Sequence, residues 1–215
     1  MSDLRRPSAD LLALRIQKLF WLARRRKRWA LLRKRIAPSL EHSEMFVGSS
    51  FATVIDIGSN LGQFAIWAAE SLDAKHIVCV EPLPDSSRQL EQLASFLKPS
   101  QVEVLNVALG ATSGNKALHV TAASDSSSLL PPVAEEAGGA LREVGTHTVR
   151  VCVGDDVLTG PYTRPILVKI DVQGSELDVL NGIPQLLSNA DAVLVEVSFA
   201  SLYDGQADPS AVVAN

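Results

Sequence analysis

Four short, nearly unbroken apolar stretches constrain the fold of this 215-residue chain more than any other feature of its sequence. They are rich in β-branched residues and read ATVIDIG, HIVCVEP, ILVKIDV and AVLVEVSF, beginning at residues 52, 76, 166 and 192. A strand without polar alternation is buried on both faces, as in a parallel sheet. A fifth stretch, VEVLNVAL at 102–109, is more mixed, and we expect it to form one further strand.

Segments with helical character separate these strands. They read GQFAIWAAESL (62–72), DSSRQLEQLASFL (85–97) and SELDVLNGIPQLL (175–187), and we expect Asp85 or Ser86 to cap the second one. Repeated alternation of strand and helix predicts right-handed βαβ units. The expected fold is therefore α/β, with a Rossmann-like, doubly wound and mainly parallel sheet.

Residues 110–153 are less regular than the rest of this domain. Two short strands are predicted there, LHVTA (118–122) and HTVRVCV (147–153). Between them lies a long loop rich in small residues, SDSSSLLPPVAEEAGGA (124–140). A loop of this length inside an α/β domain is either a segment that covers a substrate or a disordered insertion, and both interpretations stay open.

Charge is distributed unevenly along the chain. Residues 1–40 hold 12 of the 20 Lys and Arg residues and only 2 acids, a net charge of +10, whereas the other residues carry −14. A capping sequence at 8–10 predicts a helix that continues through this basic segment and ends before Pro38. We therefore divide the chain into a basic helical extension, 1–45, and a folded domain, 46–215.

Three interpretations of the basic helix are considered. It is a docked or solvated extension, a helix that contacts a membrane surface or a partner protein, or a nucleic-acid arm. The acidic domain disfavours nucleic acid. No apolar run reaches the roughly 18 residues of a membrane span, and Cys79 and Cys152 form no disulfide pattern. We expect a cytoplasmic protein, with peripheral contact to the inner face of the membrane as the alternative.

A glycine-containing turn follows the first strand, in the stretch VIDIGSNLGQF at 54–64. Gly58 lets the backbone turn sharply, and Gly62 lets the next helix start close to its neighbours or to a ligand. Asn60 is a non-glycine residue that tolerates a left-handed backbone. The following helix would present free amide groups to an anion. An ordinary tight turn between strand and helix is the alternative.

The spacing of this turn favours one nucleotide-type cofactor. It is neither the Gly-x-Gly-x-x-Gly of NAD enzymes nor a phosphate-binding loop with Gly-Lys-Ser/Thr. Asp56, two residues before the first glycine, suits the carboxylate, ammonium and ribose of S-adenosylmethionine better than a pyrophosphate. Glu81 ends the second strand, 19 residues after Gly62, where an acid can accept both ribose hydroxyls.

Taken together, five segments resemble the FkbM-type methyltransferases: VIDIGSNLGQFA, VCVEPLPDSSRQLEQL, LNVALG, ILVKIDVQGSELDVLNG and VLVEVSF. The resemblance covers roughly residues 53–203 in matching order, with Gln173 where family members commonly carry Glu. It implies a Rossmann-like, S-adenosylmethionine-dependent enzyme that methylates hydroxyl groups of sugars, glycolipids or natural products. It places the cofactor on Asp56, Gly58, Ser59, Asn60, Gly62, Glu81 and, at the adenine, Asn106.

Three acids are candidates for catalysis, because an acceptor hydroxyl must lose its proton to a base within hydrogen-bond reach. Asp171 is the first candidate and Glu176 the second, and Glu196 would face the same crevice. Glu176 also suits the first turn of the next helix, where an acid favours the helix dipole. We assign no metal, because two carboxylates without a third ligand define no site. The four histidines are scattered.

Two alternatives to an active methyltransferase remain. The first is an NAD-dependent oxidoreductase of similar topology, although neither Tyr162 nor Tyr203 lies in a hydride-transfer motif. The second is a defective relative that only binds the cofactor. Family members continue through a further helix and two more strands after the fifth strand, and we expect those strands to be missing here. The segment DGQADPSAVVAN resembles the start of that helix. An exposed sheet edge would follow, so we expect a homodimer or low stability.

Overall fold

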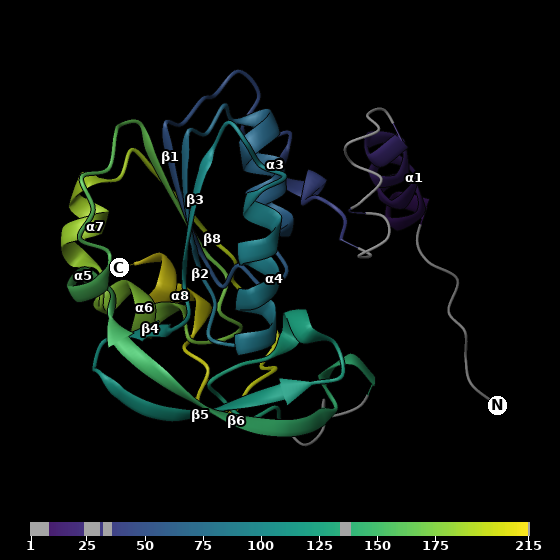
Figure 1. Ribbon diagram of the computed structural model, residues 1–215. Helices are drawn as coiled ribbons and strands as arrows, with labels where there is room; N and C mark the ends of the chain where they lie inside the picture. Colours follow the sequence, from purple (N-terminus) through teal and green to yellow (C-terminus); the bar gives the residue numbers. More distant parts are fainter. Residues whose placement is uncertain (1–8, 24–30, 32–35, 134–138, 215) are drawn as a thin grey trace.

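A five-stranded parallel sheet forms the centre of the molecule (Figure 1). The computed structural model describes residues 9–23, 31, 36–133 and 139–214. The strand order is β3-β2-β1-β7-β8. The chain adds strands outward from β1 on one side and then from β7 on the other, which confirms the predicted doubly wound, Rossmann-like fold. The strands are β1 (Thr53–Ile57), β2 (His76–Val80), β3 (Gln101–Leu105), β7 (Ile166–Ile170) and β8 (Ala192–Val195).

Helices cover both faces of this sheet, which explains the absence of polar alternation in its strands. Val54 packs into the core beneath α3 (Gln63–Ser71) and α4 (Pro84–Ala94), whereas its neighbour Ile55 belongs to the core on the opposite face. The helices of that second face are α5 (Gly154–Val157), α6 (Glu176–Asn181), α7 (Pro184–Asn189) and α8 (Pro209–Val213). Each fully buried Val or Ile side chain stabilises the fold by about 1.5–3 kcal/mol.

A second sheet, ordered β4-β6-β5, lies beyond the carboxyl ends of the parallel strands (Figure 1). Its strands are β4 (Ala108–Gly110), β5 (Gly114–Thr121) and β6 (Glu143–Val153), with short 3-10 turns η3 (Ser124–Ser126) and η4 (Gly139–Leu141) in the connection. The two strands predicted at 118–122 and 147–153 are confirmed within β5 and β6.

The single strand expected at 102–109 is wrong, because the chain leaves one sheet and enters the other at Asn106. The Asn106 side-chain amide donates to the backbone oxygens of Glu81 and Pro82 at 2.9 and 3.0 Å, and to Oγ of Ser87 at 3.0 Å. These three bonds hold the turn between β3 and β4. A polar side chain inside an apolar stretch thus marks the point at which the chain changes sheets.

Two expected helix boundaries also differ from the structure. Helix α4 begins at Pro84, with Leu83 as its N-cap, because proline is already set for the first helical position. The helix expected over 175–187 is two helices, α6 and α7, since Pro184 cannot donate the bond that would continue α6. A Cβ on Gly182 would lie 2.3 Å from the backbone oxygen of Gly110, so this break also permits close contact with the second sheet.

The N-terminal segment packs against the part of the core that includes α3. It comprises α1 (Ala9–Ala23) and η2 (Leu40–His42), and Leu22, Leu31 and Ile36 are buried with Trp67. The expected continuation of the basic helix falls on residues 24–30 and 32–35, outside the described residues. Within the described part of the chain, no helix is long and apolar enough to cross a membrane.

Strand β8 lies at one edge of the described sheet, and Val193 on it is half-exposed. The helix predicted after β8 is confirmed as α8, where Asp208 caps the first turn by accepting from the amide of Ser210. The domain division at residue 45 and the expected homodimer stay predictions.

Candidate active site

The turn after β1 has the left-handed backbone that its sequence predicted. Gly58, Asn60 and Gly62 have φ angles of 81°, 45° and 86°. A Cβ on Gly58 would lie 1.8 Å from the backbone oxygen of Asp171, and one on Gly62 would lie 2.6 Å from a methyl carbon of Leu93. Both glycines are therefore required by close packing, Gly58 against the end of β7 and Gly62 against α4.

The amides of the turn itself are bonded within the protein, whereas the free amides expected at the start of the following helix stay a prediction. The Asn60 amide donates to Glu81, the Leu61 amide to Oε1 of Gln63, and the Gly62 amide to the oxygen of Ser59. An anion would have to replace these bonds. The turn consequently offers side chains and backbone carbonyls to a ligand more readily than backbone amides.

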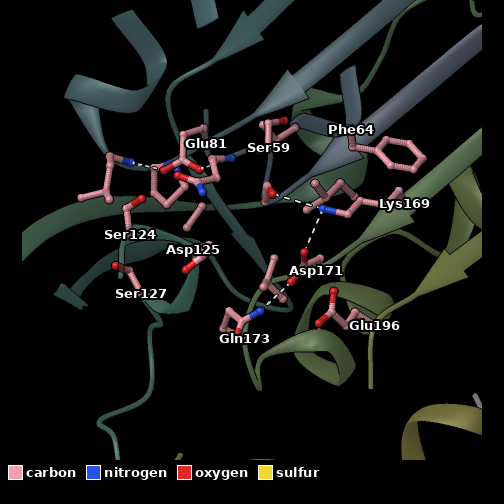
Figure 2. A pocket seen from close by; sticks show the side chains of 18 of the residues that line it. Ser59, Phe64, Glu81, Ser124, Asp125, Ser127, Lys169, Asp171, Gln173 and Glu196 are labelled. Atoms are coloured by element: carbon pink, nitrogen blue, oxygen red, sulfur yellow. Dashed lines mark hydrogen bonds and ion pairs between the residues drawn. The ribbon is translucent and has the colours of Figure 1, made fainter. Parts of the chain in front are cut away.

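A cavity of about 450 Å³ opens at the carboxyl ends of β1, β2, β7 and β8 (Figure 2). It reaches from the turn and Glu81 to Asp171 and Glu196, and residues 124–127 of the connection between β5 and β6 cover it. Parallel α/β sheets bind their ligands at this edge, where the strand order reverses. Its volume lies within the range of small-molecule sites.

Glu81 is held at the cavity by two backbone amides. Its Oε2 accepts from Asn60 and its Oε1 from Leu83, each at 2.8 Å, and the residue is 5% exposed. Burial raises the pKa of Glu81 to about 7, against the opposing effect of these two bonds. A carboxylate has about four acceptor positions, so two remain for hydroxyl donors of a ligand.

Asn60 contributes a second acceptor beside Glu81. Its Oδ1 is buried without a hydrogen-bond partner among the described residues, and the residue lines the cavity. A buried acceptor that lacks a donor is costly. The pair Glu81 and Asn60 thus fits a ligand with several hydroxyl or ammonium donors.

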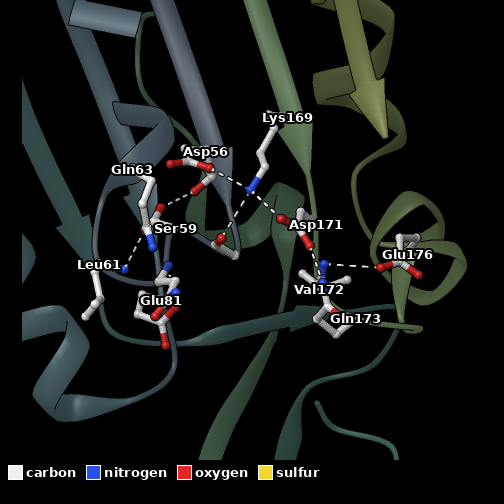
Figure 3. Close-up of polar contacts among 12 residues, drawn as sticks. Asp56, Ser59, Leu61, Gln63, Glu81, Lys169, Asp171, Val172, Gln173 and Glu176 are labelled. Carbon is white, nitrogen blue, oxygen red and sulfur yellow. Dashed lines mark hydrogen bonds and ion pairs between the residues drawn. The ribbon is translucent and has the colours of Figure 1, made fainter. Parts of the chain in front are cut away.

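Lys169 is a buried cation for which the sequence predicted no role. Asp56 and Lys169 are paired in register on β1 and β7, and the ammonium lies 3.3 Å from Oδ1 of Asp56 and 3.1 Å from Oδ2 of Asp171 (Figure 3). It also donates to the backbone oxygen of Gly58 at 3.2 Å. Burial alone would lower the pKa of Lys169, but the two carboxylates outweigh burial and raise it.

Asp56 does not line the cavity. Its side chain is fully buried behind Lys169, and its two carboxylate oxygens have no hydrogen bond of good geometry among the described residues. Lys169 itself lines the cavity, with its ammonium 5.8 Å from the ring centre of Phe64. Lys169 therefore stands between the cavity and the acid that was expected to touch a cofactor, and it contacts both Gly58 of the turn and Asp171.

Asp171 and Glu196 form the other end of the cavity. Asp171 follows β7 and accepts from the Gln173 side-chain amide at 2.7 Å through Oδ1. Glu196 follows β8 and lines the same space. Burial and the Asp171 carboxylate raise the pKa of Glu196 to about 7. The structure thus brings together two of the three acids proposed for catalysis.

Glu176 lies outside this group. Its Oε1 accepts from the amides of Val172 and Gly174 at 3.2 and 3.0 Å (Figure 3). Its side chain does not line the cavity. Burial raises the pKa of Glu176. This geometry assigns Glu176 to holding the loop after β7, in which Gln173 has a φ of 57°. Asn106 likewise holds backbone and does not line the cavity.

The segment over the cavity is fastened to the loop after β7. Oγ of Ser128 donates to the backbone oxygen of Gln173 at 2.6 Å, and the buried Tyr203 hydroxyl donates to the backbone oxygen of Ser126 at 2.7 Å. The first part of the loop expected at 124–140 is therefore an ordered cover. Residues 134–138 of that loop lie outside the described residues. Nothing in its sequence indicated Tyr203 as the anchor, because the two segments are far apart along the chain.

The N-terminal segment reaches the opposite rim. Lys18 of α1 and Glu41 of η2 form an ion pair at 2.9 Å, and both line the cavity together with Ser39. No group of three or more potential metal ligands occurs among residues 9–23, 31, 36–133 and 139–214.

The doubly wound sheet, the left-handed turn and the acids at its strand ends define a Rossmann-like methyltransferase fold. The chain belongs to the FkbM methyltransferase family, since the family profile described as "Methyltransferase FkbM domain" matches residues 56–214. It is also similar to the hexuronic acid methyltransferase AglP of Haloferax volcanii, with 29% identity over 143 residues.

That similarity covers 66% of this chain and 54% of the relative, so the chain spans about half the length of the curated relative that it matches. No solved structure matches the chain significantly.

Proposed function

We propose that the protein is an S-adenosylmethionine-dependent O-methyltransferase that transfers a methyl group to a hydroxyl of a sugar, glycolipid or natural product. The observation that carries the proposal is the continuous cavity that joins the turn and Glu81 to the Asp171 and Glu196 pair. The family supports methyl transfer in general, and the name of the Haloferax volcanii relative supports a sugar as the acceptor class.

The residues at the turn fit this cofactor. The two free acceptor positions of Glu81 would hold the ribose hydroxyls, and the unpartnered Oδ1 of Asn60 would accept from a donor of the methionine part. Val107 and Ala108 line the side on which an adenine would lie. Bound S-adenosylmethionine would supply a methyl group on a sulfonium, whose C–S bond breaks as the acceptor oxygen forms a C–O bond.

The protein would position the acceptor and take its proton. Glu196, with a pKa near 7, is suited to accept that proton, because a base works best when its pKa lies near the working pH. Asp171, held by Lys169 and Gln173, would orient the hydroxyl next to it. Alignment of oxygen, methyl carbon and sulfur would supply much of the acceleration.

Calorimetric titration with S-adenosylhomocysteine and, separately, with NAD tests the cofactor. We expect S-adenosylhomocysteine to bind and NAD not to bind. Binding of NAD alone would favour an oxidoreductase instead. Binding of S-adenosylhomocysteine without methyl transfer to any hydroxylated acceptor would favour a relative that binds the cofactor but is not catalytic.

A further inference from the structure

The charged groups that line the cavity are unequal in number. Among the described residues, two ammonium groups line it and five carboxylates do: Glu41, Glu81, Asp125, Asp171 and Glu196. Both ammonium groups are already paired, Lys18 with Glu41 at 2.9 Å and Lys169 with Asp56 and Asp171 at 3.3 and 3.1 Å. The described part of the cavity therefore offers no unpaired cation to an acidic ligand.

Three of the carboxylates, Glu81, Asp125 and Glu196, have no cationic partner within the described residues. Glu81 is held by backbone amides, and the other two belong to the region where an acceptor would lie. Asp125 is in η3 of the cover, and Glu196 follows β8 (Figure 2). Asp125 has one long contact, at 3.4 Å from Oγ of Ser126. The cover is fastened beside Gln173 by Ser128 and Tyr203, and Figure 2 shows Asp125 between Glu81 and Asp171.

This arrangement discriminates between possible acceptors by charge. A carboxylate on the acceptor would add a further negative charge close to Asp125, Asp171 and Glu196. At an effective dielectric constant of about 20, two like charges roughly 7 Å apart repel each other enough to change an equilibrium constant by more than tenfold. The methyl donor, whose sulfonium and ammonium are positive, would experience attraction from the same groups.

The remaining polar groups at this end are neutral and suit hydroxyl groups. The cover presents Ser124, Ser126 and Ser127 to the cavity, and the loop after β7 presents Gln173. Hydroxyl and amide groups both donate and accept hydrogen bonds, as the hydroxyls of an uncharged sugar ring require. The lining is thus complementary to a neutral polyhydroxyl compound.

We propose that the acceptor is a sugar or polyol without a carboxylate, and that Asp125 is a specificity-determining residue that excludes uronic acids. This inference rests on the proposed methyltransferase function. It assigns to the cover a part in acceptor selection, in addition to closing the cavity.

The test compares matched acceptors that differ only in charge. The full chain is incubated with labelled S-adenosylmethionine and either a methyl hexopyranoside or the corresponding methyl hexopyranosiduronate, over a panel of hexose configurations. We expect kcat/KM to be at least about tenfold higher for the neutral member at low ionic strength. The preference should shrink as salt is added, because salt screens these charges.

Asp125→Asn is the informative variant, because it removes the charge and keeps the shape. We expect it to lower the ratio of kcat/KM for the neutral acceptor to kcat/KM for the uronate several-fold. The control is Asp85→Asn, because Asp85 lies in the first turn of α4 and does not line the cavity. This control should leave the ratio unchanged. Because the readout is a ratio for one enzyme preparation, a general loss of activity does not affect it.

Three results would overturn the inference: equal or better transfer to the uronate, including formation of its methyl ester; a preference insensitive to Asp125→Asn; or no transfer to any neutral member of the panel. Titration with S-adenosylhomocysteine separates these results from failure of the proposed function. Binding of that ligand together with transfer to at least one acceptor rejects only the acceptor class. Binding without transfer to any acceptor favours the non-catalytic relative, and absence of binding rejects the methyltransferase assignment itself.

Discussion

The ammonium of Lys169 lies 3.3 Å from Oδ1 of Asp56, a carboxylate that is fully buried between the parallel sheet and α3. The two residues are direct neighbours in the register of β1 and β7. The same ammonium contacts Asp171 and the backbone oxygen of Gly58, so one buried cation connects the turn, the sheet interior and the acceptor end of the cavity.

Lys169→Met should destabilise the protein strongly, because it leaves Asp56 buried without a partner. We expect the free energy of unfolding to fall by about 3–5 kcal/mol, measured by urea denaturation. The double variant Asp56→Asn with Lys169→Met should recover part of this loss, since it removes the uncompensated charge. A loss below about 1 kcal/mol in Lys169→Met would contradict the role given to this ion pair.

Glu81 should make cofactor binding depend on pH. Its pKa is about 7, and only the ionised form offers all its acceptor positions to ribose hydroxyls. Affinity for S-adenosylhomocysteine should therefore fall as the pH decreases from 8 to 6, by up to about tenfold per unit below the pKa. Calorimetry over this range measures the effect. Glu81→Gln should bind more weakly and show a flat profile, and an unchanged pH dependence in that variant would exclude Glu81 as the group responsible.

Ionisation of Glu81, which should favour ligand binding, should lower the stability of the folded protein. Glu81 has a folded pKa above its ordinary value of 4.5, so the folded state binds the proton more tightly than the unfolded chain. Its contribution to stability is present below about pH 4.5 and is lost as the pH rises through 7. Bound ligand should offset this loss, which thermal melts at pH 5 and pH 8 with and without S-adenosylhomocysteine would reveal.

Glu196→Gln and Asp171→Asn should impair catalysis more than cofactor binding. Loss of a general base typically lowers kcat about 10²–10⁴-fold, while affinity for S-adenosylhomocysteine should stay within about threefold, a change of less than 1 kcal/mol. In the unaltered protein kcat should rise with pH through about 7, as Glu196 loses its proton.

Glu176→Gln is the matched control, because an amide oxygen can still accept from Val172 and Gly174. A loss of kcat in Glu176→Gln as large as in Glu196→Gln would return Glu176 to the catalytic group.

Gly58→Ala should prevent correct closure of the turn. The added methyl would lie 1.8 Å from the backbone oxygen of Asp171, on a residue with a φ of 81°. We expect a loss of stability of several kcal/mol, compared with about 1 kcal/mol for strain of a left-handed backbone alone. Gly48→Ala provides the comparison, because Gly48 has a φ of 76° and no atom within 4 Å of an added Cβ. Equal losses in the two variants would show that backbone strain, and not contact with β7, explains the need for Gly58.

Patterns within single segments predicted much of this structure. Unbroken apolar strands indicated the doubly wound sheet, and the turn sequence indicated a left-handed Asn60, because both features depend on neighbouring residues. The pairing of Asp56 with Lys169 depends instead on the register of strands more than a hundred residues apart. A lysine within the apolar stretch ILVKIDV was the available signal, since a buried charge requires a partner.

The candidate site residues also show that local sequence does not predict every contact between side chains. Glu81, Asp171 and Glu196 were found because strand ends meet at one edge of a parallel sheet, and the structure places all three around one cavity. Glu176 and Asn106 were expected at the ligand, but their side chains turn back to backbone groups. The direction of a side chain depends on which amides and carbonyls remain unsatisfied nearby, and local sequence does not give that information.

The change of sheets at Asn106 places the residues proposed to bind the methyl donor and the cover proposed to select the acceptor in different parts of the fold. Glu81 and the turn belong to the parallel sheet, whereas the cover with Asp125 belongs to the connection between β5 and β6 of the second sheet. Asn106 fastens the junction from the side of the parallel sheet only. Substitutions in the cover can therefore change the lining of the cavity at that side, while Glu81 and the turn stay in place.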